Sequence, residues 1–369
     1  MDSTQFQKMM KDAYTAHGKM DYAGSIRIAG EIFDAAKSAP DTAASLNFQS
    51  QARYQQSFSS FHAGKMDDAL GYAEQARALA AGAVALPEAT RVAGAQHPGL
   101  SLSKAHGMLG ESHTALGDFA SGEEHFYDAR KAGMSVKEPA ANAYVQALDS
   151  SMVRFYVASA QPGKADELSS MVRSAREAAK DPRLATSYLN HGEVALALGM
   201  TSQATEYARK ALDTRLADNQ QKPDVPFWTP AKLAEPHLLL AAIHIAENRL
   251  GDAEKEAGKA KELLGTAQPN KALAKTEEVL GVLTKLGAAQ GPISKREAAQ
   301  YLISGNAAYV TDEATQKVLG VTPPKVAARF SEKSYLDLAY EAPFEALSSA
   351  RTPVALRGLD GPRASGWAK

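Results

Sequence analysis

The sequence predicts an all-α protein built from stacked helical hairpins. Two observations carry this prediction: a turn-plus-helix motif recurs along the chain, and the helix-period segments on either side of it are rich in alanine. Gly18–Ala23 (GKMDYA) returns 46 residues later as Gly64–Ala69 (GKMDDA). Recurrence of one supersecondary unit is typical of a solenoid, in which each hairpin buries its apolar face against its neighbours.

Related turns begin at Gly117, Gly163, Gly199 and Asn248. We expect the glycine or asparagine of each turn to end the first helix in a left-handed conformation, so that the chain reverses into the second. Successive turns lie 36 to 53 residues apart, more than the about 34 residues of the simplest helix–turn–helix arrays. We therefore expect longer helices or extra loops, with proline-containing loops at 82–99 and 218–230.

The spacing of large and small residues around these turns resembles the tetratricopeptide repeat family. The best match is Ala105–Ala129, where Leu109-Gly110 precedes the turn Gly117–Phe119 and small residues follow on the second helix. Tyr188–Ala211 and His237–Ala260 match next best. The resemblance covers about residues 4–287, and it implies a right-handed α–α superhelix in which small residues let the paired helices approach closely.

Repeats near Thr4, Gln51 and Asp149 fit less well. In the fourth repeat Phe155-Tyr156 occupies the Leu-Gly place, and we expect that bulk to push the two helices apart. The predicted domain of 1–290 therefore holds about six hairpins, followed by a capping helix over Ala272–Leu286.

Beyond Gln290 the pattern changes to short amphipathic pieces. Ser294 opens a capping box for a helix to about Ser304, and further short helices are expected at 311–320, 325–330, 335–340 and 344–347. We predict that 291–350 is an atypical helical region that caps the stack or docks on a partner. The basic end, 351–369, is predicted to be an extended tail.

Composition excludes several classes of function. The 369 residues carry a formal net charge of −1 and contain no cysteine, which removes zinc–thiolate sites, iron–sulfur clusters and any electrostatic case for nucleic acid. No segment reaches the roughly 20 apolar residues that span a membrane. With no signal peptide visible, we expect a bacterial cytoplasmic protein, or a periplasmic one if a signal peptide has been removed.

The histidines offer two pairs at i, i+7 spacing, His106 with His113 and His237 with His244. Each pair lies on one helix face, but roughly 10 Å apart, whereas a metal shared on one helix needs i, i+4 spacing. Both pairs also fall on packing positions of the repeat. We therefore expect interface histidines and no metal or cofactor, although a metal or pH-sensing role stays open. No catalytic motif is present, so an enzyme is not expected.

The first helices of the hairpins supply the expected binding site. In the family that the chain resembles, certain positions of these helices point into a concave groove. They fall here on Tyr54, Phe58, Phe61, Lys104, Glu111, Arg154, Leu189, Asn190, Glu193, Leu238 and Ile245. Such a groove suits an amphipathic helix or an extended peptide. The alternative is that these side chains are buried against neighbouring helices.

These features favour a non-enzymatic scaffold that binds a protein or peptide partner in its groove, assembles with copies of itself, or serves as a subunit of a larger assembly. The alternative is a regulatory sensor of the same type, which binds a peptide and switches conformation. Compaction on binding, measured by small-angle scattering, would distinguish the sensor from the scaffold.

Overall fold

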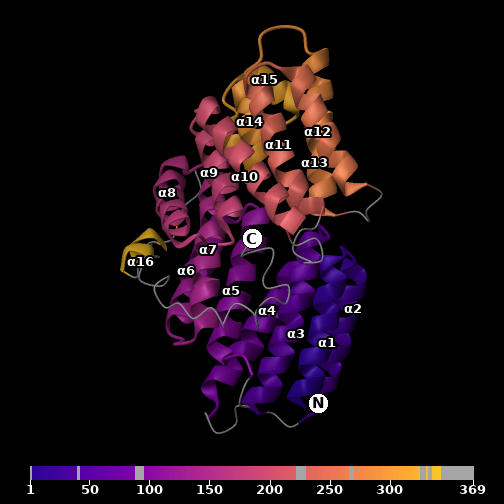
Figure 1. The fold of residues 1–369 in the computed structure, drawn as a ribbon, viewed down its shortest axis with the longest axis vertical. Helices are drawn as coiled ribbons and strands as arrows, with labels where there is room; N and C mark the ends of the chain where they lie inside the picture. The colour runs from indigo at the N-terminus through magenta and orange to yellow at the C-terminus, as the bar shows by residue number, and fades with distance from the viewer. Residues whose placement is uncertain are drawn as a thin grey trace. The chain divides into compact units, whose positions relative to one another are not determined.

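The computed structural model describes residues 2–39, 42–87, 95–221, 230–265, 270–324, 330 and 335–341, and every regular element in these ranges is helical. The prediction of an all-α solenoid is thus confirmed (Figure 1). The chain divides into two compact units, unit 1 (Met1–Asp149 with Phe330–Ala368) and unit 2 (Ser150–Arg329). No helix among the described residues is long and apolar enough to cross a membrane.

The helices alternate along the chain as first (A) and second (B) members of hairpins. The A helices are α1 (Ser3–Gly18), α3 (Ala43–His62), α5 (Pro98–Ala115), α7 (Pro139–Ala158), α9 (Leu184–Ala197) and α11 (Pro230–Ala246). The B helices are α2 (Tyr22–Lys37), α4 (Met66–Ala85), α6 (Phe119–Met134), α8 (Pro162–Ala179), α10 (Thr201–Gln221) and α12 (Leu250–Leu264). They are followed by α13 (Lys271–Ala288), α14 (Lys295–Ser304), a 3₁₀ turn (Ala307–Tyr309), α15 (Glu313–Leu319) and α16 (Tyr335–Glu341).

One residue in each turn between an A and a B helix has the left-handed conformation. Their φ angles are between 58° and 80°, and the residues are Met20, Gly64, Gly117, Ala160, Gly199 and Asn248. The prediction of the turn residue is therefore right in four repeats and wrong in two. Gly18 is the last residue of α1 and Gly163 is the second of α8. The matching letters Gly18–Ala23 and Gly64–Ala69 are thus two residues out of structural register.

The left-handed residue fixes the packing register of every hairpin. Seven residues before it, on the A helix, lie Ala13, Ser57, Gly110, Val153, Gly192 and Ala241. A Cβ on Gly110 would come within 2.9 Å of the Phe126 ring on α6, and one on Gly192 within 3.3 Å of the Ala204 carbonyl on α10. The expected closeness of A and B helices at these glycines is therefore confirmed.

The same register corrects the fourth repeat. Val153, not Tyr156, occupies the small position of α7, because the turn is at Ala160 and not at Gly163. The helices there do not have to accommodate a tyrosine at their closest approach. On the B helices, the positions five, nine and twelve residues after the left-handed residue are equally regular: Ala69, Ala73, Ala76 on α4, Ala204, Ala208, Ala211 on α10 and Ala253, Ala257, Ala260 on α12 are fully buried.

The two expected loops begin later than predicted. Helix α4 continues to Ala85 and α10 to Gln221, since neither 82–85 nor 218–221 contains the proline that would stop a helix. Pro98 and Pro230 open α5 and α11, where the missing amide hydrogen costs nothing. The expected helices at 325–330 and 344–347, and the tail 351–369, lie outside the described residues.

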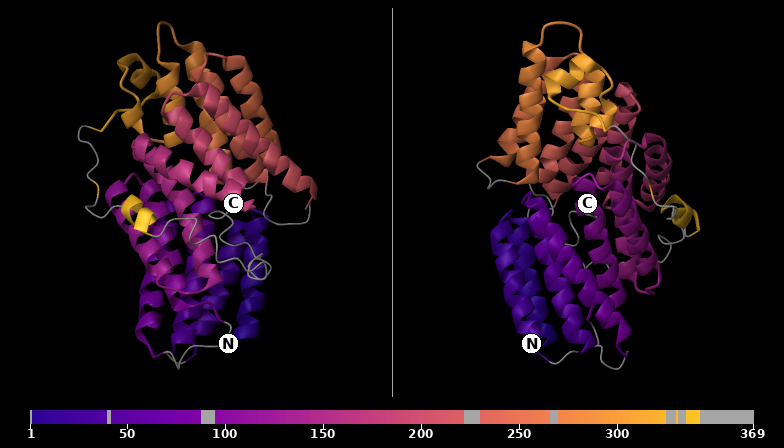
Figure 2. Two further views of the ribbon diagram at one scale, coloured as in Figure 1. Left: turned by 60° about the vertical axis from the view of Figure 1, so that its left-hand side comes forward. Right: turned by 180° about the vertical axis from the view of Figure 1, so that it is seen from behind.

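The segment after Gln290 packs on unit 2 through α14, as Figure 2 shows. Ser294 caps α14 as expected, accepting a hydrogen bond from the Glu297 amide at 3.3 Å. Ala298, Ala299 and Leu302 are buried among side chains of α9, α11 and α13. This segment therefore extends the apolar core of unit 2.

Side chains of the same segment bind backbone carbonyls at the ends of two A helices. Gln300 donates to the Ala197 carbonyl at 2.7 Å, at the end of α9. Asn306 donates to the Ala158 carbonyl at 2.7 Å, and the Tyr309 hydroxyl to the Val157 carbonyl at 3.0 Å, both at the end of α7. The Val157 carbonyl also accepts from the Ala160 amide at 3.2 Å. The segment thus supplies side-chain partners to carbonyls at helix ends, where the regular helical hydrogen bonds stop.

Helix α16 is anchored in unit 1 by a buried polar triad. The Tyr335 hydroxyl donates to Asp149 Oδ1 at 2.8 Å, and Arg130 on α6 forms an ion pair with the same carboxylate. All three side chains are fully buried. Removing one partner would leave a charge unpaired in the core, which is strongly destabilising.

Candidate functional site

The aromatic residues expected in the groove lie in the core of unit 1. Tyr54, Phe58 and Phe61 on α3 are only 4%, 1% and 6% exposed. The Phe58 ring stacks on His17 of α1 with the ring centroids 4.5 Å apart. For these three side chains the structure has the alternative arrangement, burial against neighbouring helices, and a role in partner binding stays a prediction.

Lys104 and Glu111 on α5 are half-buried. The Lys104 ammonium donates to Gln96 Oε1 at 2.6 Å and lies 5.8 Å from the centroid of the Tyr54 ring. Burial raises the pKa of the Tyr144 hydroxyl, and the charge of Glu111 raises it further. A cation and an acid thus stand beside aromatic side chains.

In unit 2 the expected residues divide between core and surface. Leu189, Asn190 and Ile245 are buried, and the Asn190 side-chain amide donates to the Ser150 carbonyl at 2.9 Å, which ties α9 to α7. Leu238 is half-buried and packs at the edge of the apolar core. These residues therefore serve the packing of A helices on one another.

Arg154 on α7 and Glu193 on α9 are half-buried and belong to a charged cluster of unit 2. Burial raises the pKa of Glu193 to about 7, partly offset by the positive charge of Arg154 and reinforced by the negative charge of Glu235 on α11. Lys275 on α13 also acts on Glu193. The charges of α7, α9, α11 and α13 are thus close enough to influence one another.

The sequence did not reveal the other members of this cluster, Arg215, Lys232 and Glu235. Arg215 at the end of α10 is 1% exposed, pairs with Glu235 at 2.9 Å and donates to the Lys232 carbonyl. Burial raises the pKa of Glu235, but the charges of Lys232 and Arg215 outweigh it, so the pKa is lowered overall. Only the packing of one hairpin on the next brings Arg215 and Glu235 together, since a proline-rich segment separates them in sequence.

We call Arg154, Glu193, Arg215, Lys232, Glu235 and Lys275 the unit 2 charged cluster. Four of its members are cations and two are acids. The Lys232 and Arg215 charges stabilise Glu235 as a carboxylate, whereas Glu193, with a pKa of about 7, is about half protonated at pH 7. Lys275 also pairs with Glu278 at 2.9 Å. With that acid included, the cations still outnumber the acids by four to three, so the cluster has a small excess of positive charge and can attract a carboxylate or another anionic group.

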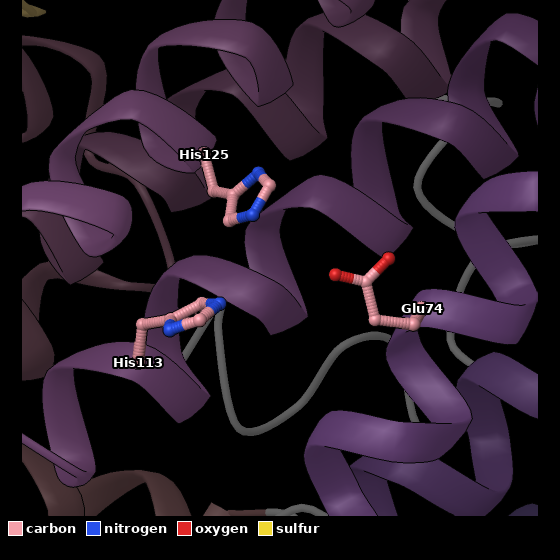
Figure 3. Close-up of side chains that lie close together, drawn as sticks. All are labelled: Glu74, His113 and His125. Carbon is pink, nitrogen blue, oxygen red and sulfur yellow. The ribbon is translucent and has the colours of Figure 1, made fainter. Parts of the chain in front are cut away.

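A second polar cluster lies in unit 1, between α4, α5 and α6. It holds His106 and His113 of α5 and His125 of α6, with Glu74 of α4 and Asp128 of α6 nearby. Figure 3 shows three of these side chains, Glu74, His113 and His125. Burial, then the charge of His125, lower the pKa of His106 to about 4; burial, then the charge of His113, also lower that of His125. As expected from their repeat positions, His106 and His113 lie at a helix interface, where both contact His125 of α6.

The corresponding pair in unit 2 does not form such a cluster. His237 on α11 binds Glu256 Oε2 on α12 at 2.6 Å, and His244 lies 3.8 Å from Glu247. Within the described part of the chain, the groups that could hold a metal ion are confined to the α4–α6 cluster.

No protein-family model matches the chain, and no curated protein matches it. Among solved structures, it is similar to the aspartyl phosphate phosphatase F from Bacillus subtilis, with 12% sequence identity and a TM-score of 0.47. That match covers 90% of this chain and 98% of the other. At this identity and TM-score, the likeness carries no argument about function or sites.

Proposed function

We propose that the protein is a non-enzymatic binding scaffold whose A-helix surface holds a protein or peptide partner. The observation that carries the proposal is the unit 2 charged cluster. The A helices α7, α9 and α11, together with α10 and α13, contribute charged side chains to it, and Glu193 has a pKa raised to about 7. Partial burial of more cations than acids costs folding free energy. A bound partner of opposite charge can offset that cost.

The chemistry of the cluster favours an acidic partner segment. Arg154, Lys232 and Lys275 can each donate to a carboxylate, and Arg154 can do so through two parallel hydrogen bonds. Half-buried charges also have more effect on binding than fully exposed ones, because they are less screened by salt. A helix or extended segment with acidic side chains, or a C-terminal carboxylate, fits this description.

The test compares partner capture by the full chain and by an Arg154→Ala, Lys275→Ala double variant. Both proteins are immobilised, exposed to the same cell extract and washed at two salt concentrations, and the captured proteins are identified by mass spectrometry. The proposal expects a specific partner to be retained by the parent chain, to be lost from the double variant, and to bind less at the higher salt concentration.

The matched control is a double variant of exposed lysines on a B helix, Lys255→Ala with Lys259→Ala on α12. It removes the same amount of positive charge without touching the cluster, and both side chains are mostly exposed. It should capture the partner as well as the parent chain does. Equal capture by all three proteins, or loss with the control alone, would contradict the proposed site.

A further inference from the structure

Three helices of unit 1 bring two imidazoles and a carboxylate to one place. Glu74 on α4, His113 on α5 and His125 on α6 each have a potential ligand atom, and these atoms lie within 4.8 Å of one another. Figure 3 shows both imidazole rings turned toward the carboxylate of Glu74. All three side chains are half-buried, so they are held by packing and still accessible to an ion.

We propose that Glu74, His113 and His125 bind a divalent transition-metal ion of the zinc class. Two imidazole nitrogens and one carboxylate oxygen form a ligand set that zinc accepts in proteins, and three protein ligands leave a fourth position for water or for a partner's side chain. Imidazole also suits copper, nickel and iron, whereas magnesium and calcium prefer sites made of oxygen alone.

The other ring nitrogen of each proposed histidine ligand is already held. His113 Nδ1 lies 3.1 Å from Asp118 Oδ2, and His125 Nδ1 lies 3.2 Å from His106 Nδ1. Both contacts use Nδ1 and leave Nε2 for the ion. This matches the usual arrangement of metal-binding histidines, in which a hydrogen bond at one nitrogen fixes the ring and directs the other toward the metal.

The separation of the groups is compatible with a site that closes on its ion. Bonds of 2.0–2.1 Å in a tetrahedron place two ligand atoms about 3.3 Å apart, so groups within 4.8 Å need to approach further. Glu74 is the side chain that can move, because it is 44% exposed. Its Oε2 pairs with Arg77 at 3.0 Å, and binding of an ion would have to weaken that ion pair or use the second oxygen.

The repeat architecture accounts for the contact of His106 with His125. It does not account for the approach of Glu74 to His113 and His125. Side chains 19 residues apart in a hairpin also meet as Tyr188 with Tyr207 and as His237 with Glu256. The meeting of His106 with His125 follows the same geometry. Glu74, from the preceding hairpin, is not part of that pattern. Its approach to two imidazoles is the observation that points to an ion.

A neighbouring set, His106, His125 and Asp128, also has its potential ligand atoms within 4.8 Å. It shares His125 with the proposed site, so variants must distinguish the two. Glu74 and His113 belong only to the proposed set, whereas Asp128 belongs only to the neighbouring one. Asp128→Asn is therefore a matched control on α6, the helix that carries His125.

The experiment titrates Zn²⁺ into the full-length, tag-free, metal-stripped protein against a chromophoric chelator, and measures the thermal midpoint with and without the ion. We expect one equivalent to bind and the midpoint to rise, since a ligand that binds only the folded state stabilises it. His113→Asn and Glu74→Gln should each weaken binding by about tenfold or more. Asp118→Asn should weaken it by about 10- to 100-fold through the orientation of His113.

Two controls should bind Zn²⁺ like the parent chain: Asp128→Asn, and His237→Asn in the histidine–carboxylate pair of unit 2. Far-UV circular dichroism checks that each variant is folded. If a histidine variant does not fold, Glu74→Gln still tests the site, because Glu74 is partly exposed and its substitution should leave the fold intact. The proposal is overturned if the parent chain binds no more Zn²⁺ than the folded Glu74→Gln variant. It is equally overturned if Asp128→Asn abolishes binding while Glu74→Gln and His113→Asn leave it unchanged.

Discussion

The two turn residues that are neither glycine nor asparagine carry backbone strain. Met20 and Ala160 have φ angles of 60° and 58°, in a region where the Cβ of an ordinary residue crowds the following carbonyl oxygen. Gly64, Gly117 and Gly199 occupy the equivalent positions without that crowding. Strain at these two turns is therefore not required by the fold and can be removed by substitution.

We predict that Ala160→Gly stabilises the protein by about 0.5–1 kcal/mol, because relief of the left-handed conformation outweighs the entropy lost by glycine on folding. Chemical denaturation of both proteins, with midpoint and slope compared, measures the change. The control is Ala178→Gly on α8, where the backbone is helical and glycine should cost about 1 kcal/mol. A loss of stability with Ala160→Gly would contradict the register assigned to the fourth repeat.

Residue types alone could locate most of the turns but not these two. Glycine adopts the left-handed conformation easily, so a glycine between two helix-period segments predicts the turn residue. In repeats one and four a glycine stands two or three residues away, at Gly18 and Gly163, and the packing of the hairpin determines the turn position instead. The wrong prediction for Tyr156 has the same cause. With the turn at Gly163, Tyr156 would be seven residues before it and would occupy the small position of α7, whereas the turn is at Ala160.

At the candidate site, too, the sequence predicts some of the charged side chains and not others. Arg154 and Glu193 could be predicted from their repeat positions, because both lie on A helices in a shared register. Arg215 and Lys232 could not, since they join the cluster only when the end of α10 packs against the start of α11. Likewise, the i, i+7 spacing of His106 and His113 argued against a metal, because the sequence does not show that Glu74 and His125 come from neighbouring helices.

At the scale of elements, the short helices after Gln290 contribute to the core of unit 2. Ala298, Ala299 and Leu302 on α14 are at most 1% exposed. Their apolar spacing and the Ser294 capping box predicted the helix itself. Its location on α9, α11 and α13 could not be predicted, because it depends on carbonyls at the ends of α7 and α9 that only the folded stack presents.

We predict that a chain ending at Gln290 melts about 5–10 °C below the full chain or aggregates. Its unit 2 would expose the apolar surface that α14 covers, and burial of one leucine alone contributes about 1.5–3 kcal/mol. Differential scanning calorimetry and light scattering measure both outcomes. A second chain, ending at residue 324, keeps α14 and α15 and should recover stability relative to the shorter one. If the chain ending at Gln290 is as stable as the full chain, α14 is not part of the cooperative core.

For the whole molecule, stability should depend on pH through the buried ionisable groups of unit 2. Burial, together with the charge of Arg173, lowers the pKa of His191, so the unfolded state binds this proton more readily and stability falls as pH drops below about 6.5. Arg183 outweighs the effect of burial and lowers the pKa of Asp181 to about 2, so that its contribution is lost as pH falls from about 4 to 2. Both groups make the protein less stable in acid.

Glu193 acts in the opposite direction. Its pKa is raised to about 7 in the folded protein, above the roughly 4.3 of an unfolded glutamate. The folded state therefore holds more protons between these values, and stability falls as pH rises through this window. Above pH 7 the protein must keep a half-buried carboxylate ionised, which is the unfavourable charge that a bound partner can offset.

We predict that Glu193→Gln stabilises the protein at pH 8 by ~1–2 kcal/mol and has little effect at pH 4, where the glutamate is mostly protonated in both states. The figure stays below the full equivalent of such a pKa shift because a half-exposed charge is partly screened. Denaturant unfolding at pH 4, 6 and 8 gives the comparison, and Glu262→Gln, at an exposed position of α12, is the control that should change stability equally little at each pH. If Glu193→Gln destabilises the protein at pH 8, the ionised carboxylate is stabilised within the cluster by Arg154 and Lys275. The positive charges would then be satisfied internally, and an acidic partner would have to displace Glu193 to reach them.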